Sequence, residues 1–123
     1  MITADFQARL DAWVAGAQKL IDDEWVERKY THAMSPVLRL AVGSRFVKVT
    51  RLDRSTAGVV SERGSVHAFI DITGGNIDGV NHQPGDVLKP ATYWAPAKHA
   101  RGNLFDDKGG LGWMSSYGPA YLK

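Results

Sequence analysis

In residues 1–31, apolar side chains recur at spacings of three and four, the period of one face of an α-helix. Thr3 is placed to cap the N-terminus of such a helix, and Asp5 falls in its first turn, where the helix dipole favours a negative charge. No proline interrupts the pattern before Pro36. It predicts a helix from about residue 4 to about residue 29. The apolar stripe consists of Phe6, Leu10, Trp13, Val14, Ala17, Leu20 and Ile21.

Residues 45–53 and 65–72 alternate between apolar and other side chains, which is typical of strands. One face of each segment carries valine, alanine and isoleucine, and we expect these faces to pack on the helix. The opposite faces bring together Phe46, Lys48, His67 and Phe69. Two interpretations of this second face stay open: an exposed platform of rings and cations, or a second core layer covered by other parts of the chain.

The remaining segments give weaker signals. Residues 37–42 are apolar but too short to distinguish helix from strand, and residues 86–94 predict a third strand that Pro90 confines to an edge or a bulge. Residues 97–101 predict one helical turn that ends at Gly102. The glycine-rich tail that follows is expected to be a loop anchored by Trp113, Tyr117 and Tyr121.

Together these segments predict one α+β domain over residues 1–123. A long acidic helix (1–31) packs on a small, mainly antiparallel sheet (37–94), and a basic loop with a Gly-rich C-terminal tail follows (95–123). The length is sufficient for a buried core, and 44% hydrophobic with 23% charged residues is typical of soluble globular proteins. There is no cysteine, no N-terminal leader and no run near the roughly 18 apolar residues of a membrane span. We therefore expect a cytoplasmic protein that does not enter membranes.

Charge is divided unevenly along the chain. The net charge is +2, but residues 1–31 hold four Lys/Arg against six Asp/Glu, whereas residues 32–123 hold eleven against seven. Residues 88–104 contain no acidic side chain. Cations interleaved with aromatic rings suit a single-stranded nucleic acid, because phosphates attract the cations and unpaired bases stack on the rings. The candidate nucleic-acid-binding residues are Arg45, Lys48, Arg51, Arg54, Phe69, Lys89, Tyr93, Trp94, Lys98, His99 and Arg101.

Catalytic chemistry finds no support in the sequence. The four histidines are scattered, without a zinc-ligand spacing, and no serine lies in a nucleophile-elbow motif. The segment GGNIDG lacks the lysine of a phosphate-binding loop, and Asp106 with Asp107 is more typical of a solvated turn than of a cation site. The sequence thus predicts a protein that is not an enzyme, with no catalytic residues, no metal site and no cofactor.

From Arg45 onward the chain resembles a group of small phage-encoded proteins of mostly unknown role. The resemblance is carried by RFVKVTR, SVHAFID and GDVLKPATYWAPAKHARGNLFDD, and by the closing YGPAYL. In size and character the chain is also similar to the single-stranded DNA-binding cofactors that recruit the RNA polymerase of schitovirus-type phages to middle promoters. This resemblance implies single-stranded DNA as ligand, a phage RNA polymerase as partner and the host cell cytoplasm as location.

The resulting hypothesis is a non-enzymatic single-stranded DNA-binding protein, acting in viral transcription or replication. The alternative is a small phage structural or protein-interaction module, which the long apolar stripe and the aromatic tail would also suit. Part of the stripe could pack on a second copy of the chain, and we therefore expect a homo-oligomer.

Overall fold

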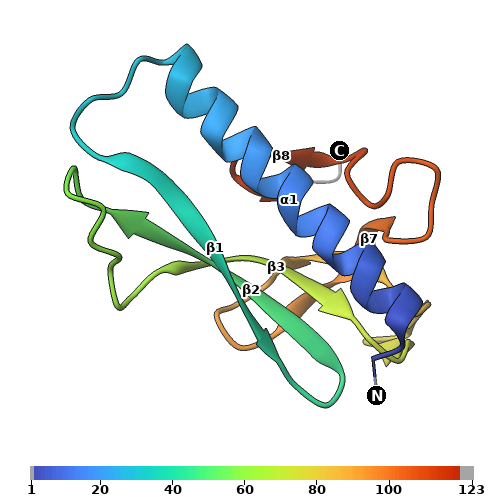
Figure 1. The fold of residues 1–123 in the computed structure, drawn as a ribbon. Coiled ribbons are helices and arrows are strands. Elements are labelled where there is room, and N and C mark those ends of the chain that lie inside the picture. The colour runs from blue at the N-terminus through green and yellow to red at the C-terminus, as the bar shows by residue number, and fades with distance from the viewer. Residues whose placement is uncertain (1, 120–123) are drawn as a thin grey trace.

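The computed structural model of the chain describes residues 2–119, in which one long helix, α1 (Ala4–Glu27), lies across one face of a five-stranded sheet (Figure 1). Neighbouring strands are antiparallel throughout this sheet. Its spatial order is β1 (Met34–Val42), β2 (Phe46–Arg54), β3 (Ser65–Asp71), β6 (Asp86–Pro90) and β7 (Pro96–Asn103). Two short hairpins complete the described fold: β4 (Gly75–Ile77) with β5 (Val80–His82), and β8 (Met114–Ser115) with β9 (Gly118–Pro119). The predicted α+β architecture is confirmed.

Helix α1 begins as expected, because the Thr3 hydroxyl accepts a hydrogen bond from the Phe6 N–H at 3.1 Å. It ends at Glu27, two residues before the predicted boundary. Five of the seven stripe residues are buried, with Trp13 0% exposed, while Val14 and Leu20 are half-buried. The Trp13 indole N–H also donates to the Gly110 carbonyl at 3.2 Å, which ties the glycine-rich segment to the helix. Most of the stripe is therefore used within the chain, and the homo-oligomer stays a prediction.

The helix-facing side of the sheet is apolar, as the alternation predicts. Its members are 0% exposed and share one core with the stripe: Val47, Val49, Ala68, Ile70 and Val87. A bulge in β3 changes one expected orientation, because Val49 pairs with Ala68 whereas Thr50 pairs with Val66. The extra residue, His67, lies on the helix side, under the C-terminal hairpin, and not beside Phe69 as alternation alone predicts.

Residues 97–101 form the middle of β7 and not a helical turn, so this prediction is wrong. Nucleating a single helical turn costs free energy, because several residues are fixed for one hydrogen bond. As a strand, the same backbone instead pairs with β6. The ambiguous segment 37–42 belongs to β1, an edge strand of the sheet. The Gln18 side chain accepts from the Leu38 N–H at 3.0 Å and donates to the Pro36 carbonyl at 2.8 Å, and so occupies part of this open edge.

The tail differs from the expected loop. It contains the β8–β9 hairpin, and the Trp113 side chain is 55% exposed. Tyr117 is 65% exposed, but its hydroxyl donates to the Glu24 carboxylate of α1 at 2.8 Å and so anchors the tail through a polar contact. Leu111 and Met114 also pack against the core. Tyr121 lies outside the described residues.

Within residues 2–119, no helix is both long and apolar enough to cross a bilayer.

Candidate nucleic-acid interface

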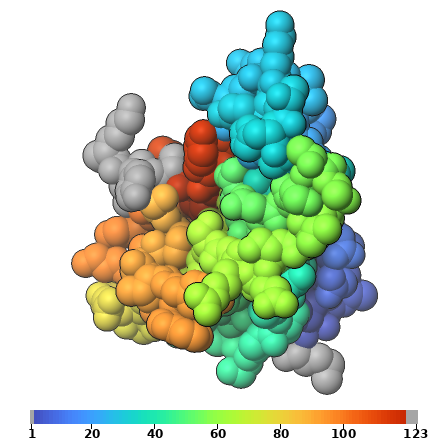
Figure 2. Space-filling model, turned by 90° about the vertical axis from the view of Figure 1, so that its left-hand side faces the viewer, coloured from blue at the N-terminus to red at the C-terminus, as the bar shows by residue number. Residues whose placement is uncertain are grey.

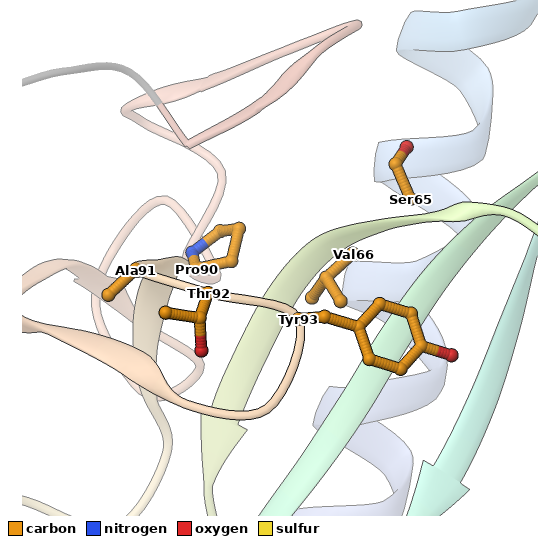
Figure 3. A pocket seen from close by; sticks show the side chains of 6 residues that line it. All are labelled: Ser65, Val66, Pro90, Ala91, Thr92 and Tyr93. Carbon is orange, nitrogen blue, oxygen red and sulfur yellow. The ribbon is translucent and has the colours of Figure 1, made fainter.

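The side of the sheet turned away from α1 carries the candidate site. The loop between β6 and β7 folds over this side, and Figure 3 shows Tyr93 in front of the strands with the helix behind them. Thr92 stabilises the loop, since its hydroxyl accepts from the N–H groups of Trp94 and Ala95, each at 3.1 Å. In Figure 2 the orange loop region lies beside the yellow-green β3 region. The second face is thus partly covered and partly open.

The loop presents two aromatic rings next to a lysine. Tyr93 and Trp94 meet edge to face, with ring centroids 4.8 Å apart and planes at 80°. The Lys48 ammonium lies 3.3 Å from the Tyr93 ring centroid and 4.7 Å from that of Trp94, so cation–π attraction holds it to both rings. Trp94 is 81% exposed and Tyr93 47%. Trp94 therefore offers a ring face to solvent beside a positive charge.

Hollows flank these rings on both sides. The larger, of about 550 Å³, lies between the β1–β2 hairpin and Trp94. It is lined by Ala41, Val42, Gly43, Ser44, Arg45, Phe46, Lys48, Phe69 and Trp94. The smaller, of about 290 Å³, lies beside Tyr93 and the start of β3 (Figure 3). Both are shallow surface hollows of mixed polar and apolar character.

Phe69 belongs to a second layer of packing and not to an open platform. It is 3% exposed and contacts Phe46 edge to face, with centroids 6.0 Å apart. Because its ring is covered, Phe69 cannot stack on a base. The covered-core interpretation therefore holds for Phe69, whereas the exposed Tyr93 and Trp94 rings belong to the loop and not to the sheet face for which the two interpretations were open.

Arg45 lies at the rim of the larger hollow. Its guanidinium pairs with the buried Asp71 carboxylate at 3.2 Å and donates to the Asn76 carbonyl, also at 3.2 Å. It lies 4.9 Å from the Phe46 ring centroid. These contacts fix Arg45 and offset much of its charge, so it shapes the hollow more than it attracts phosphate.

Four of the predicted cations lie elsewhere. Arg51 and Lys89 are on the helix side of the sheet, where Arg51 donates to the Ser116 carbonyl at 2.8 Å and Lys89 to the Pro119 carbonyl at 3.2 Å. Arg54 donates to the Ser35 carbonyl at 2.6 Å. Arg101 is 7% exposed, and burial lowers the pKa of its guanidinium. The contacts of Arg51 and Lys89 place them on the side of the sheet away from Trp94, while Arg54 is engaged by Ser35 and Arg101 is buried.

Three further basic side chains, Arg39, Lys98 and His99, are exposed on the edge strands β1 and β7. Lys98 and His99 are exposed on β7, in agreement with their availability for a ligand. Arg39 is exposed on β1, and the pairing of Arg39 with Thr50 and of Ala41 with Lys48 places it on the face of Lys48. The sequence interpretation missed Arg39. The signal was the alternation of Leu38, Arg39 and Leu40, which becomes visible only when the segment is known to be a strand.

A second buried polar cluster, around His82 and Asp86, is structural. His82 Nδ1 lies 2.9 Å from an Asp86 carboxylate oxygen, and its Nε2 lies 2.7 Å from the Lys98 carbonyl. Asp86 also accepts from the Gln83 N–H and the Asn103 amide, at 3.0 and 2.9 Å. These bonds join β5, β6 and β7 and engage both carboxylate oxygens of Asp86.

The Asp106 carboxylate is likewise occupied by its own turn. Burial alone would raise the pKa of Asp106, but backbone N–H groups, including those of Gly110 and Asn103, outweigh burial and hold this pKa below its usual value. The carboxylate thus organises the glycine-rich segment.

The fold and the site define a small α+β protein with one helix-covered sheet face and one partly open face that carries exposed aromatic rings. A model of a family of unknown function (DUF7717) matches residues 5–117, and the chain belongs to this family. No curated protein and no solved structure matches the chain.

Proposed function

We propose that the chain is a non-enzymatic single-stranded DNA-binding protein that binds its ligand across the sheet face turned away from α1. The observation that carries this proposal is Trp94, an indole 81% exposed at the edge of a hollow of about 550 Å³. A large aromatic ring held in the open by a structured loop gains little for folding. Unpaired bases are the natural partners of such a ring, because each base offers a free face for stacking.

Charge on the same face supports a phosphate-bearing ligand. Lys48 lies between the Tyr93 and Trp94 rings, and Arg39 is exposed on the neighbouring strand. Lys98 and His99 are exposed on β7, the edge strand that follows the loop with the rings. These cations attract a backbone that passes the rings, while the rings distinguish a single strand from a duplex, whose bases are already stacked.

From the resemblance to phage proteins we extend the proposal to a role in viral transcription or replication in the host cell cytoplasm. A phage RNA polymerase is the proposed protein partner, and unwound DNA is the proposed site of action. A homo-oligomer would place several such faces along one strand.

The test is fluorescence anisotropy with a labelled twelve-nucleotide thymidine strand and a duplex of the same length, at two salt concentrations. Trp94→Ala should weaken single-strand binding by about tenfold, since stacking contributes roughly 1–3 kcal/mol per base. The matched control is Trp113→Ala, which removes another exposed indole, 55% exposed, in the glycine-rich segment. Equal affinities for single strand and duplex, or equal losses in the two variants, would overturn the proposal.

A second candidate is a protein-interaction module, favoured by apolar side chains exposed near the end of α1 and in the β2–β3 loop. Val26 is 78% and Val59 68% exposed. A folded protein without single-strand affinity at low salt would favour this candidate.

A further inference from the structure

The C-terminal hairpin covers a cluster of cations on the helix side of the sheet. Arg51 on β2, His67 on β3 and Lys89 on β6 lie on three adjacent strands. We call residues Met114–Pro119 the strap, because this segment runs over the cluster. Its main-chain carbonyls at Ser116 and Pro119 accept from Arg51 at 2.8 Å and from Lys89 at 3.2 Å.

Polar contacts supply much of what holds the strap. The Ser116 hydroxyl donates to Glu24 of α1, and the Tyr117 hydroxyl donates to the same carboxylate at 2.8 Å. The Ser116 hydrogen bond is the main reason why the pKa of Glu24 lies below its usual value. The strands of the strap contain two residues each, and a hairpin this short is marginally stable by itself. Within residues 2–119 the strap strands pair with each other and not with the main sheet, so we expect the strap to be displaced without unfolding that sheet, although this exposes Met114 and the buried Pro119.

We propose that Arg51 and Lys89 form a binding site for linked phosphate groups, and that such a ligand competes with the strap for these two cations. Arg51 and Lys89 are only half-buried, so a ligand can approach them from the side. In the closed state the partners of Arg51 and Lys89 include carbonyl oxygens, which carry no net charge, and Arg51 also interacts with the Tyr117 ring and the Glu24 carboxylate. Phosphate oxygens would form stronger, charge-assisted hydrogen bonds with both.

The spacing of the cations selects the ligand class. The strands β2 and β6 are separated by β3 alone, which puts their backbones roughly 10 Å apart at the usual strand spacing. Arg51 pairs with Ser65 whereas Leu88 pairs with Phe69, so the two cations are also offset along the strands. A chain of phosphates can bridge two cations at this separation better than one phosphate ion can. The site is independent of the proposed single-strand face, since it lies on the opposite side of the sheet and requires no base.

The first test is hydrogen exchange of the full chain with inorganic tripolyphosphate, a probe without bases. Competition predicts that amides of residues 114–118 exchange at least threefold faster when the probe is bound, because binding and strap closure oppose each other. Unchanged or slower exchange in the strap of the bound protein, or no binding of tripolyphosphate at low salt, would overturn the proposal. A parallel titration with the thymidine strand identifies the source of the phosphates: a strap response to both probes indicates generic linked phosphates, and a markedly stronger response to the strand indicates nucleic acid.

The second test loosens the strap and measures tripolyphosphate affinity. Glu24→Gln weakens two charge-assisted hydrogen bonds and should raise the affinity about tenfold, because the open fraction grows. The control Glu27→Gln changes the net charge by the same amount as Glu24→Gln, at the exposed last residue of α1. It should have little effect on the tripolyphosphate affinity. Arg51→Gln should remove the gain from Glu24→Gln.

An uncharged pair of variants separates strap opening from local charge. A side chain at Gly118 would lie 2.5 Å from the His67 carbonyl oxygen, so Gly118→Ala should displace the strap and raise affinity several-fold. Gly109 also has a positive φ, but a β-carbon there meets nothing within 4 Å. Equal affinities of Gly118→Ala and Gly109→Ala, in variants with native near-ultraviolet circular dichroism, would overturn the competition.

Discussion

Burial of His67 predicts a specific loss of stability in mild acid. The side chain is 2% exposed, and none of the groups in residues 2–119 forms a hydrogen bond with its Nε2. Burial, followed by the charges of Arg51 and Lys89, lowers the pKa of His67 from 6.5 to about 4. The folded protein therefore keeps a neutral imidazole at this position at neutral pH.

The sign of the effect follows from proton uptake. As the pH falls below 6.5, the unfolded chain binds a proton at His67 that the folded chain does not bind until about pH 4. The free energy of unfolding must therefore fall through this window and be insensitive to His67 above pH 7. The complete loss is about 3 kcal/mol, of which about 2 kcal/mol occurs between pH 7 and pH 5.

Urea unfolding at pH 7, 6 and 5 measures this slope. His67→Gln keeps a polar side chain that has no ionisable group. Between pH 7 and pH 5 this variant should therefore lose about 2 kcal/mol less of its unfolding free energy than the wild type does. His99→Gln removes an exposed imidazole and should keep the wild-type slope. The carboxyls of Glu24 and Asp106, whose pKa values are lowered in the fold from 4.5 and 3.8, affect stability mainly below this range.

Parallel stability curves for the wild type and His67→Gln would refute the reasoning. That result would mean that His67 accepts a proton in the folded state near its ordinary pKa. The β3 bulge would then expose the imidazole, and the packing of the strap over it would be wrong.

Two further predictions concern the core. Trp13→Ala should destabilise the protein by about 3–5 kcal/mol in urea unfolding, because it leaves a cavity and removes the hydrogen-bond donor of the Gly110 carbonyl. A loss of stability below about 1 kcal/mol would contradict the place of Trp13 in the core. Asp86→Ala should cost about 3–5 kcal/mol, because His82, Gln83 and Asn103 lose a shared acceptor. Asp86→Asn keeps one acceptor oxygen and should cost less, and equal losses for the two variants would show that the hydrogen bonds do not matter.

The strongest predictions from sequence were those that depend on local periodicity. The stripe of α1 and the alternation of β2 define which side chains face the core, and both predictions are confirmed. The capping role of Thr3 is equally local and equally correct. These features need only the chain's own repeat and the removal of apolar surface from water.

Predictions failed where a distant partner decides the outcome. Residues 97–101 contain helix-compatible side chains, but pairing with β6 makes them a strand. The bulge at His67 depends on the register between β2 and β3, which no single segment encodes. Trp113, expected as an anchor of the tail, is 55% exposed, while Leu111 and Met114 pack inward.

For the candidate site, the sequence identified the chemistry but not its distribution in space. The concentration of cations and rings in residues 88–104 is a property of composition, and Lys48, Tyr93 and Trp94 do come together. Only the tertiary structure shows that Arg51 and Lys89 lie on the opposite face under the strap, and that Phe69 is covered. The physical reason is that alternation separates neighbours onto two faces, whereas the side that a loop or tail then covers depends on contacts between residues far apart in the chain.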